Sequence, residues 1–429
     1  MESYPRDAVV RVPRFASRRE GDEAIVSTPD ADVLLCFPVE GLDVLDDLSR
    51  GLTVGQMADR YRDRHGEPPD IEDFLHALTD QGFPLEVVRH PAPSDAVAPV
   101  PAGAHDHGPT SPTGGRHRAV SFDGIPPAVA RRLCGTPVLV GFALLVAVGV
   151  VAAGDDPGLL PGATALLFPN GHFAALTLAT LLLALAAVFL HETAHAVVAR
   201  STGASSRLVL GNLMYTMVAQ TEISSIWLAP RRTRYLAFLS GTVVDLVAAS
   251  LLVDVLWAQR HGWIALQDTV VAPLLSAFLF TYGARISFQF LFYLRTDLYY
   301  VLSTALGCKN LMTDTEDLLR NLLARALRRP AHVDQSGIPR HELRGVRVYA
   351  AFYALGRTFW LGVLVFFYLP LLWGYSQQFV LLATGRPHRF GTLDFVVVAG
   401  LAFLIDGGGI LMWVRGLRAR RRAARGAAR

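Results

Sequence analysis

Six long apolar stretches in the second two-thirds of the chain constrain its fold more than any other feature. Each is long enough to cross the ~30 Å hydrocarbon core of a bilayer, which takes about 20 helical residues. Lipid offers no hydrogen-bond partners, so a spanning backbone must satisfy its own N–H and C=O groups, as a helix does. We therefore expect a mainly α fold with six transmembrane helices, at 133–153, 173–199, 235–257, 271–294, 346–373 and 392–414.

Composition agrees with a polytopic membrane protein. Hydrophobic residues make up 52% of the chain, which is high for a soluble enzyme of 429 residues. The N-terminus is charged and polar, so no cleavable signal peptide is visible. Cys36, Cys134 and Cys308 lie far apart, which argues against a disulfide framework or a cysteine-based zinc site.

Basic residues alternate between the two sides of the predicted bundle. The second and fourth connections and the C-terminal tail hold 21 Lys or Arg, whereas the other three connections hold 3. Because basic loops stay in the cytoplasm, both termini are expected there, and the chain is expected in the cell membrane. The basic tail at 416–429 then lies on the cytoplasmic leaflet and anchors the chain to anionic lipid.

The first 90 residues read as a separate soluble domain. They contain 10 Arg and 19 Asp or Glu, a net charge of −9. Short β-branched runs at 7–15, 22–29 and 31–38 predict three strands, and three amphipathic helices follow, with Thr53 and Asp70 as N-caps. This order predicts a small α+β domain of winged-helix type. Its negative charge disfavours a nucleic-acid partner.

Composition also sets the remaining domain boundaries. Residues 91–126 are rich in Pro, Ala, Gly and Ser and predict a flexible linker. Residues 127–415 then form the six-helix membrane domain, followed by the tail.

The stretch "VFLHETAHAVVAR", residues 188–200, carries the chemistry of the second apolar segment. His191 and His195 are four residues apart, so one helix face presents both to a single metal ion. Glu192 lies beside them and has the character of a general base. Ionisable side chains are costly in a membrane and are rarely kept without a function or a partner. The alternative is that two packed histidines and a glutamate coincide by accident.

A zinc hydrolase needs a third protein ligand, and three acids lie in or beside the apolar segments. Asp297 follows the fourth segment at its cytoplasmic end, at a membrane depth close to that of His195. Asp406 in the sixth segment is the second choice by depth, and Asp245 lies deeper in the third. Arg285 in the fourth segment is expected to pair with Asp245 or Asp254.

These motifs resemble those of the site-2-protease-like intramembrane zinc metalloproteases, in particular the peptide zinc metalloprotease branch. Besides the first helix, "LRTDLYYVLSTALGCKNL" at 294–311 is similar to the motif that supplies the third ligand, here Asp297. "LSGTVVDLVA" at 239–248 is similar to a small-residue motif near the substrate, which would place Gly241 and Asp245 there. The resemblance implies bound Zn²⁺, catalysis by Glu192 and peptide-bond hydrolysis.

The chain also departs from that family pattern. The glycine that follows the ligand aspartate is Leu298 here, and Leu291 and Phe292 stand where the family has Asn-Pro. The local helix break that presents the aspartate therefore lacks its usual residues.

The first domain resembles the PqqD-like domains, which grip the leader peptides of ribosomally made, modified peptides. The resemblance implies that a leader adds as a strand along Asp32 to Phe37, beside the helix at 70–82. A second strand-addition site is expected beside the metal, where 205–228 alternates enough to form a strand or re-entrant hairpin; a packed amphipathic connector is the alternative.

Three functions remain open. The first is an endopeptidase that matures a leader-bearing peptide. The second is a non-catalytic membrane transport or immunity factor that keeps the ligands as structure. The third is a regulatory protease that cuts a membrane-anchored anti-sigma-type protein.

Overall fold

Helices dominate the fold, as the apolar stretches predict. The computed structural model divides into two compact units, Met1–Arg116 with Ser224–Pro230, and His117–Ile223 with Arg231–Arg429. The residues described are 4–21, 23–28, 33–88, 120–162, 165–166, 173–213, 216–266, 270–307, 311–330, 333, 335, 340–369, 373, 376–377, 380–381, 383–385 and 391–427.

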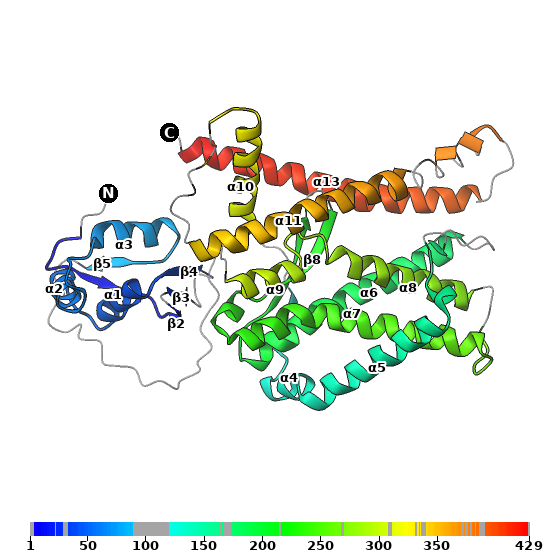
Figure 1. Ribbon diagram of the computed structural model, residues 1–429, viewed down its shortest axis with the longest axis horizontal. Helices are drawn as coiled ribbons and strands as arrows, with labels where there is room; N and C mark the ends of the chain where they lie inside the picture. The colour runs from blue at the N-terminus through cyan, green and yellow to red at the C-terminus, as the bar shows by residue number, and fades with distance from the viewer. Residues whose placement is uncertain are drawn as a thin grey trace. The chain divides into compact units, whose positions relative to one another are not determined.

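The first unit holds two small sheets and three helices (Figure 1). Antiparallel strands β2, β3 and β4 form one sheet in that order, and β1 pairs with β5 in the other. The core is apolar, with Val10, Val26, Leu45, Met57 and Leu75 fully or almost fully buried. The elements are β1 (Val9–Arg11), β2 (Ala16–Glu20), β3 (Glu23–Thr28), β4 (Val33–Pro38), α1 (Val39–Ser49), α2 (Val54–His65), α3 (Ile71–Asp80) and β5 (Glu86–Val88).

The strand prediction for this unit was incomplete. The first predicted run supplies only β1, which pairs with β5 and not with its neighbours in sequence. Strand β3 pairs with β4 on one side and with β2 on the other. The sequence of β2, "ASRRE", is polar and partly exposed, so it lacks the apolar alternation from which the other strands were predicted. Both predicted N-caps are confirmed: Thr53 forms a capping box with Gln56, and Asp70 accepts the N–H of Asp73.

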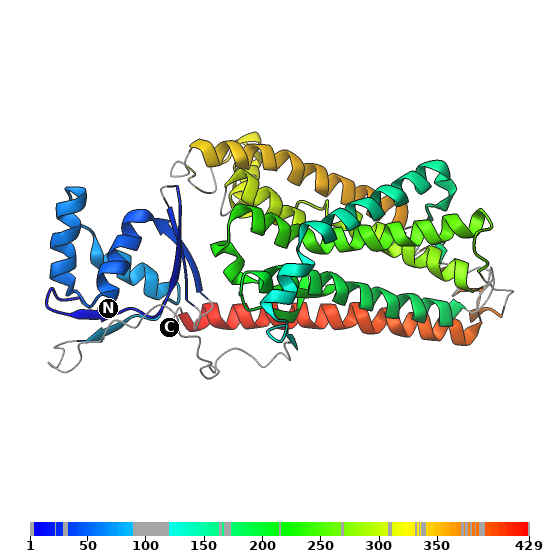
Figure 2. The same ribbon diagram turned by 90° about the horizontal axis from the view of Figure 1, so that it is seen from below.

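Most helices of the second unit run side by side along one direction, and α10 runs across them (Figures 1 and 2). A three-stranded antiparallel sheet, in the order β6-β7-β8, lies beside α6. The predicted hairpin within 205–228 is confirmed as β7 and β8. The strands are β6 (Val120–Ser121), β7 (Arg207–Leu213) and β8 (Thr216–Glu222). The helices are α4 (Pro127–Leu133), α5 (Thr136–Asp155), α6 (Phe173–Ser201), α7 (Arg231–Arg260), α8 (Val271–Phe288), α9 (Asp297–Leu306), α10 (Leu311–Ala326), α11 (Arg340–Val363) and α13 (Thr392–Ala427).

Five helical segments among the described residues are long and apolar enough to cross a membrane. They are Pro127–Asp155, Phe173–Ser201, Arg231–Arg260, Val271–Phe288 and Glu342–Phe366. The sixth predicted span lies within α13, whose described apolar part, Thr392–Leu401, is shorter than a span. The predicted tail from 416 continues α13 as helix to Ala427. Most of the predicted linker lies outside the described residues, but its end includes β6.

The fourth predicted segment ends six residues early, and this break positions the candidate site. Helix α8 stops at Phe288, and a series of turns leads to Asp297, the first residue of α9. Helix α11 holds these turns, because the Tyr349 hydroxyl donates to the Phe292 carbonyl. Gly356 permits the close approach, since a Cβ there would lie 3.2 Å from the Phe292 nitrogen. The helix thus breaks without the Asn-Pro of the family pattern.

Candidate metal centre

Three ligand atoms from α6 and α9 converge on one point. His191 and His195 extend from the same face of α6, and Asp297 reaches them from the start of α9. The two Nε2 atoms are 3.2 Å apart, and Asp297 Oδ2 lies 3.1 Å from the first and 3.4 Å from the second. Ligands ~2.0–2.1 Å from a tetrahedral ion lie about 3.3 Å from each other, so these separations fit a small divalent metal.

Hydrogen bonds on the far side of each ring fix which nitrogen carries the proton. His191 Nδ1 lies 2.9 Å from the Asp245 carboxylate, and His195 Nδ1 lies 2.6 Å from the Ala237 carbonyl. Both partners are acceptors, so both Nδ1 atoms are assigned as donors. In neutral imidazoles the Nε2 lone pairs then face each other and the Asp297 carboxylate. Such a buried group of acceptors is suited to binding a cation.

Asp245 is the innermost charge of the site, with 1% of its surface exposed. Arg285 on α8 neutralises it, with a terminal guanidinium nitrogen 3.2 and 3.1 Å from its two carboxylate oxygens. This is the ion pair that the sequence predicts. An ionised carboxylate behind His191 orients the ring and makes it a stronger ligand. The structure therefore places Asp245 behind a ligand, whereas the family resemblance placed it near the substrate.

Gly241 on α7 lies directly against His191. A Cβ at this position would lie 2.5 Å from Nε2 and 2.6 Å from the two adjoining ring carbons, closer than side chains approach. The absence of a side chain is therefore what admits the imidazole. The sequence predicted Gly241 as a substrate contact, and the structure adds a contact with a ligand that sequence reasoning missed.

Asp297 is held in place by Gln289, a residue that sequence reasoning did not select. Gln289 donates to Asp297 Oδ2 at 3.0 Å and accepts the Asp297 backbone N–H at 3.1 Å. The N-terminus of α9 adds a favourable partial positive charge.

Glu192 connects the metal centre to the sheet. Its Oε2 accepts the backbone N–H of Thr221 at 2.6 Å, and the Thr221 hydroxyl donates to the Glu192 carbonyl at 2.9 Å. Strand β8 is an edge of the described sheet, so this N–H points away from β7 toward α6. The residue predicted as the general base is thus fixed to the strand predicted to bind substrate.

The sequence-predicted ligands His191, His195 and Asp297 come together, and they form the metal-type cluster found among the described residues. The alternative ligand Asp406 belongs to α13, and its side chain lies outside what the structure describes. The donor set of two imidazoles and one carboxylate could hold zinc or another divalent metal. Sequence patterns gave no signal for Ala237, because its contribution is a backbone carbonyl.

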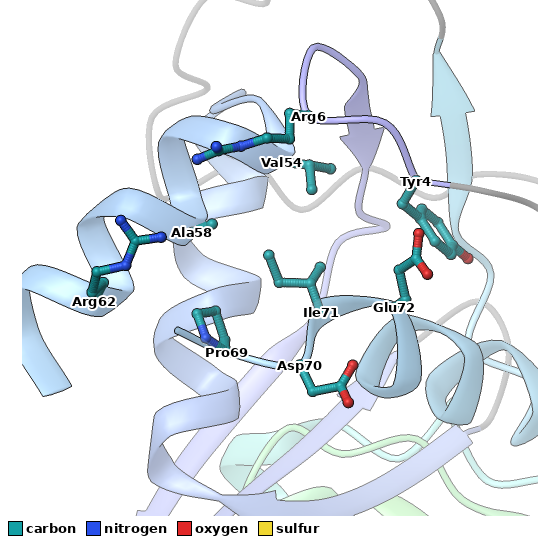
Figure 3. A pocket seen from close by; sticks show the side chains of 9 residues that line it. All are labelled: Tyr4, Arg6, Val54, Ala58, Arg62, Pro69, Asp70, Ile71 and Glu72. Atoms are coloured by element: carbon teal, nitrogen blue, oxygen red, sulfur yellow. The ribbon is translucent and has the colours of Figure 1, made fainter. Parts of the chain in front are cut away.

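The first unit carries a separate pocket of about 350 Å³ beside α2 and the start of α3 (Figure 3). Its basic side is partly neutralised, because Arg6 and Arg62 lie 2.7 and 3.5 Å from Asp59. It contains no metal-type cluster among the described residues. The lining residues are Tyr4, Arg6, Val54, Ala58, Arg62, Pro69, Asp70, Ile71 and Glu72.

Comparison with models of known protein families, with curated proteins and with solved structures gave no match for this chain.

Proposed function

We propose that this chain is a membrane-embedded zinc endopeptidase. One observation carries the proposal: two imidazole Nε2 atoms and one carboxylate oxygen converge within 3.1–3.4 Å, with both Nδ1 atoms held by acceptors. Three protein ligands of this kind leave one position open on a tetrahedral ion, which is the pattern of catalytic zinc sites. Structural sites use four.

The residues around the cluster have distinct roles in this proposal. His191, His195 and Asp297 hold the metal, which when bound supplies Lewis acidity to the scissile carbonyl and makes water nucleophilic near neutral pH. Glu192 takes a proton from the attacking water while the oxygen of that water forms a bond to the carbonyl carbon. The same carboxyl then gives that proton to the leaving nitrogen as the C–N bond breaks. Because Thr221 occupies Oε2, we assign proton transfer to Oε1.

Substrate binding is assigned to the edge of β8. Antiparallel pairing makes every second residue of an edge strand point its N–H and C=O outward, so Ala219 faces the same way as Thr221. An extended peptide on this edge would pair with the outward groups of Ala219, because the Thr221 N–H is already donated to Glu192. Strand addition supplies backbone hydrogen bonds with little demand on side chains, and it opens the internal hydrogen bonds of a helical substrate.

The first unit is assigned to recruitment of the precursor. Its β4 is an edge strand of the β2-β3-β4 sheet, beside α3, where Phe37 and Phe74 pack edge to face 5.5 Å apart. A leader peptide of a ribosomally made precursor would add along β4; the predicted start of this edge, Asp32, lies outside the described residues. The acidic charge of the unit disfavours nucleic acid. Both termini are assigned to the cytoplasm.

Glu192→Gln tests the proposal, because it removes the base and keeps the size of the side chain. The chain is co-expressed with candidate leader-bearing precursor peptides, and the products are identified by mass spectrometry. Glu192→Gln should lower cleavage by roughly 10²–10⁴-fold with zinc content unchanged. Glu342→Gln in the first turn of α11, away from β8 and from the metal cluster, is the matched control and should cleave normally. Full zinc occupancy without proteolysis would favour the transport or immunity function, and cleavage of a single-span protein would favour the regulatory protease.

A further inference from the structure

Helix α10 runs across the direction of the helices that are long and apolar enough to span a membrane (Figure 1), so in a bilayer crossed by those helices it would lie along the membrane plane. It packs against α11 near the end at which α11 begins. Contacts with α11 come from its first part: Thr315 donates to the Val346 carbonyl, and Tyr353 donates to Glu316 at 3.1 Å. Leu318 and Leu319 pack against the buried cluster of Tyr299, Tyr349 and their neighbours. The first half of α10 is therefore anchored to the membrane domain.

The apolar face of α10 continues beyond these contacts. Leu322 and Leu323 follow Leu318 and Leu319 at helical spacing, and Leu327 extends the same face by one turn. Their exposed fractions are 48%, 61% and 57%. Protein thus covers the first half of this face, whereas the described residues leave the second half largely uncovered.

Charge is divided along the helix in the same way. Glu316 and Asp317 lie in the anchored half, where Arg320 pairs with both at 3.2 and 2.9 Å. The outer end carries Arg325 with Arg328 and Arg329. None of these three forms an ion pair with a described carboxylate, and no acidic residue lies between 318 and 333. The exposed leucines are consequently bordered by positive charge that no described carboxylate pairs with.

The way in which the helix ends keeps arginine where glycine is usual. The N–H of Arg328 donates to the Arg325 carbonyl and that of Arg329 to the Ala324 carbonyl, which is a Schellman ending. Arg328 occupies the left-handed position of this motif, with φ 54°, and it is the non-glycine residue with positive φ among those described. An L residue is strained there, and glycine would relieve the strain. This position therefore carries a strained arginine, which adds a positive charge, where an unstrained glycine would fit.

We propose that the outer half of α10 is a membrane-surface anchor that binds anionic phospholipid. Leu322, Leu323 and Leu327 enter the acyl boundary, and Arg325, Arg328 and Arg329 contact the phosphate headgroups. An amphipathic helix lying in the bilayer plane with basic residues on its polar side has the properties that such binding requires. This inference does not depend on the proteolytic function. It identifies the connection between α9 and α11 as the part of the chain that senses lipid charge.

Site-directed spin labelling of the full chain tests this anchor. Leu323→Cys carries the label on the apolar face, and Ala324→Cys, one residue and ~100° further round the helix, is the matched control. Both are made with Cys36→Ser, Cys134→Ser and Cys308→Ser and are reconstituted in two kinds of nanodisc. One contains phosphatidylcholine alone, and the other adds ~30% phosphatidylglycerol. The measured quantity is accessibility to oxygen relative to a water-soluble nickel chelate.

We expect this ratio at 323 to exceed that at 324 by at least ~2-fold and to rise further with phosphatidylglycerol. Arg325→Gln with Arg328→Gln and Arg329→Gln should remove the response to phosphatidylglycerol. Equal water exposure of both labels would overturn the proposal, as would dipolar broadening at 323, which signals a second copy. A label at 323 that is deep but indifferent to lipid charge, or a response that survives the arginine substitutions, would overturn the anionic specificity.

Discussion

Gly241→Ala gives the sharpest test of the metal centre, because it adds one methyl group to a helix facing His191. The new Cβ would lie 2.5 Å from Nε2, whereas ordinary contacts begin near 3.4 Å. The ring or α7 must therefore move by about 0.9 Å. Metal–ligand bonds tolerate only ~0.2 Å, so His191 cannot stay in the coordination sphere after such a shift.

The ring has little freedom to move away. Its Nδ1 is held by Asp245 at 2.9 Å, and Arg285 in turn holds Asp245. We therefore expect zinc affinity to fall by on the order of 100-fold or more. Crowding a packed site by one methyl group costs about 1–3 kcal/mol of unfolding free energy, so the protein should still fold.

Two other glycines separate this effect from general damage. Gly283→Ala on α8 meets open space, so it should not lower stability and should leave zinc binding unchanged. Gly149→Ala on α5 would place its Cβ 2.5 Å from the Ser250 side chain, so it should lower the melting temperature and keep zinc. Zinc is measured by a chelator competition titration, and the ligand sphere by the visible spectrum of the Co²⁺ form. Wild-type affinity in Gly241→Ala would refute the ring position and the ligand geometry built on it.

Three further predictions follow from the contacts of single side chains. Asp245→Asn should weaken zinc binding by roughly 10–100-fold in the same titration, because a neutral amide orients His191 less firmly. Unchanged affinity would show that this hydrogen bond does not contribute to zinc binding. Gln289→Ala should also weaken zinc binding, by about 10-fold, with the helices intact by circular dichroism, since Asp297 loses its clamp. Asp47→Ala should lower the unfolding free energy of the first unit by about 1–3 kcal/mol in urea and leave zinc unaffected. The reason is that Arg50, Arg60 and Arg64 all lie within 3.2–3.6 Å of this buried carboxylate.

Sequence predicted best the features that depend on local pattern. Apolar length predicted the spans, and the spacing of His191 and His195 predicted a shared face. The cluster with Asp297 could be predicted because family resemblance and membrane depth agreed on it. The pairing of Arg285 with Asp245 followed from the cost of isolated charge in a membrane.

The features that sequence missed depend on contacts between distant segments. Gln289 looks like the end of an apolar helix until the break at Phe288 turns it toward Asp297. Strand β5 gives too short a run to be recognised, and its pairing with β1 spans nearly the whole first unit. In the sequence Gly241 is one of several small residues in its helix, and no local pattern indicates that it contacts the His191 ring.

The contact between Gly241 and His191 offers a way to sort distant relatives by sequence alone. The glycine follows the first histidine by 50 residues, and Asp245 follows the glycine by four. A homologue that keeps both histidines but has a larger residue in place of Gly241 would have no room for the ring, and we expect it to lack the metal site. A residue other than glycine at this position would then mark lineages that kept the membrane scaffold without the metal site.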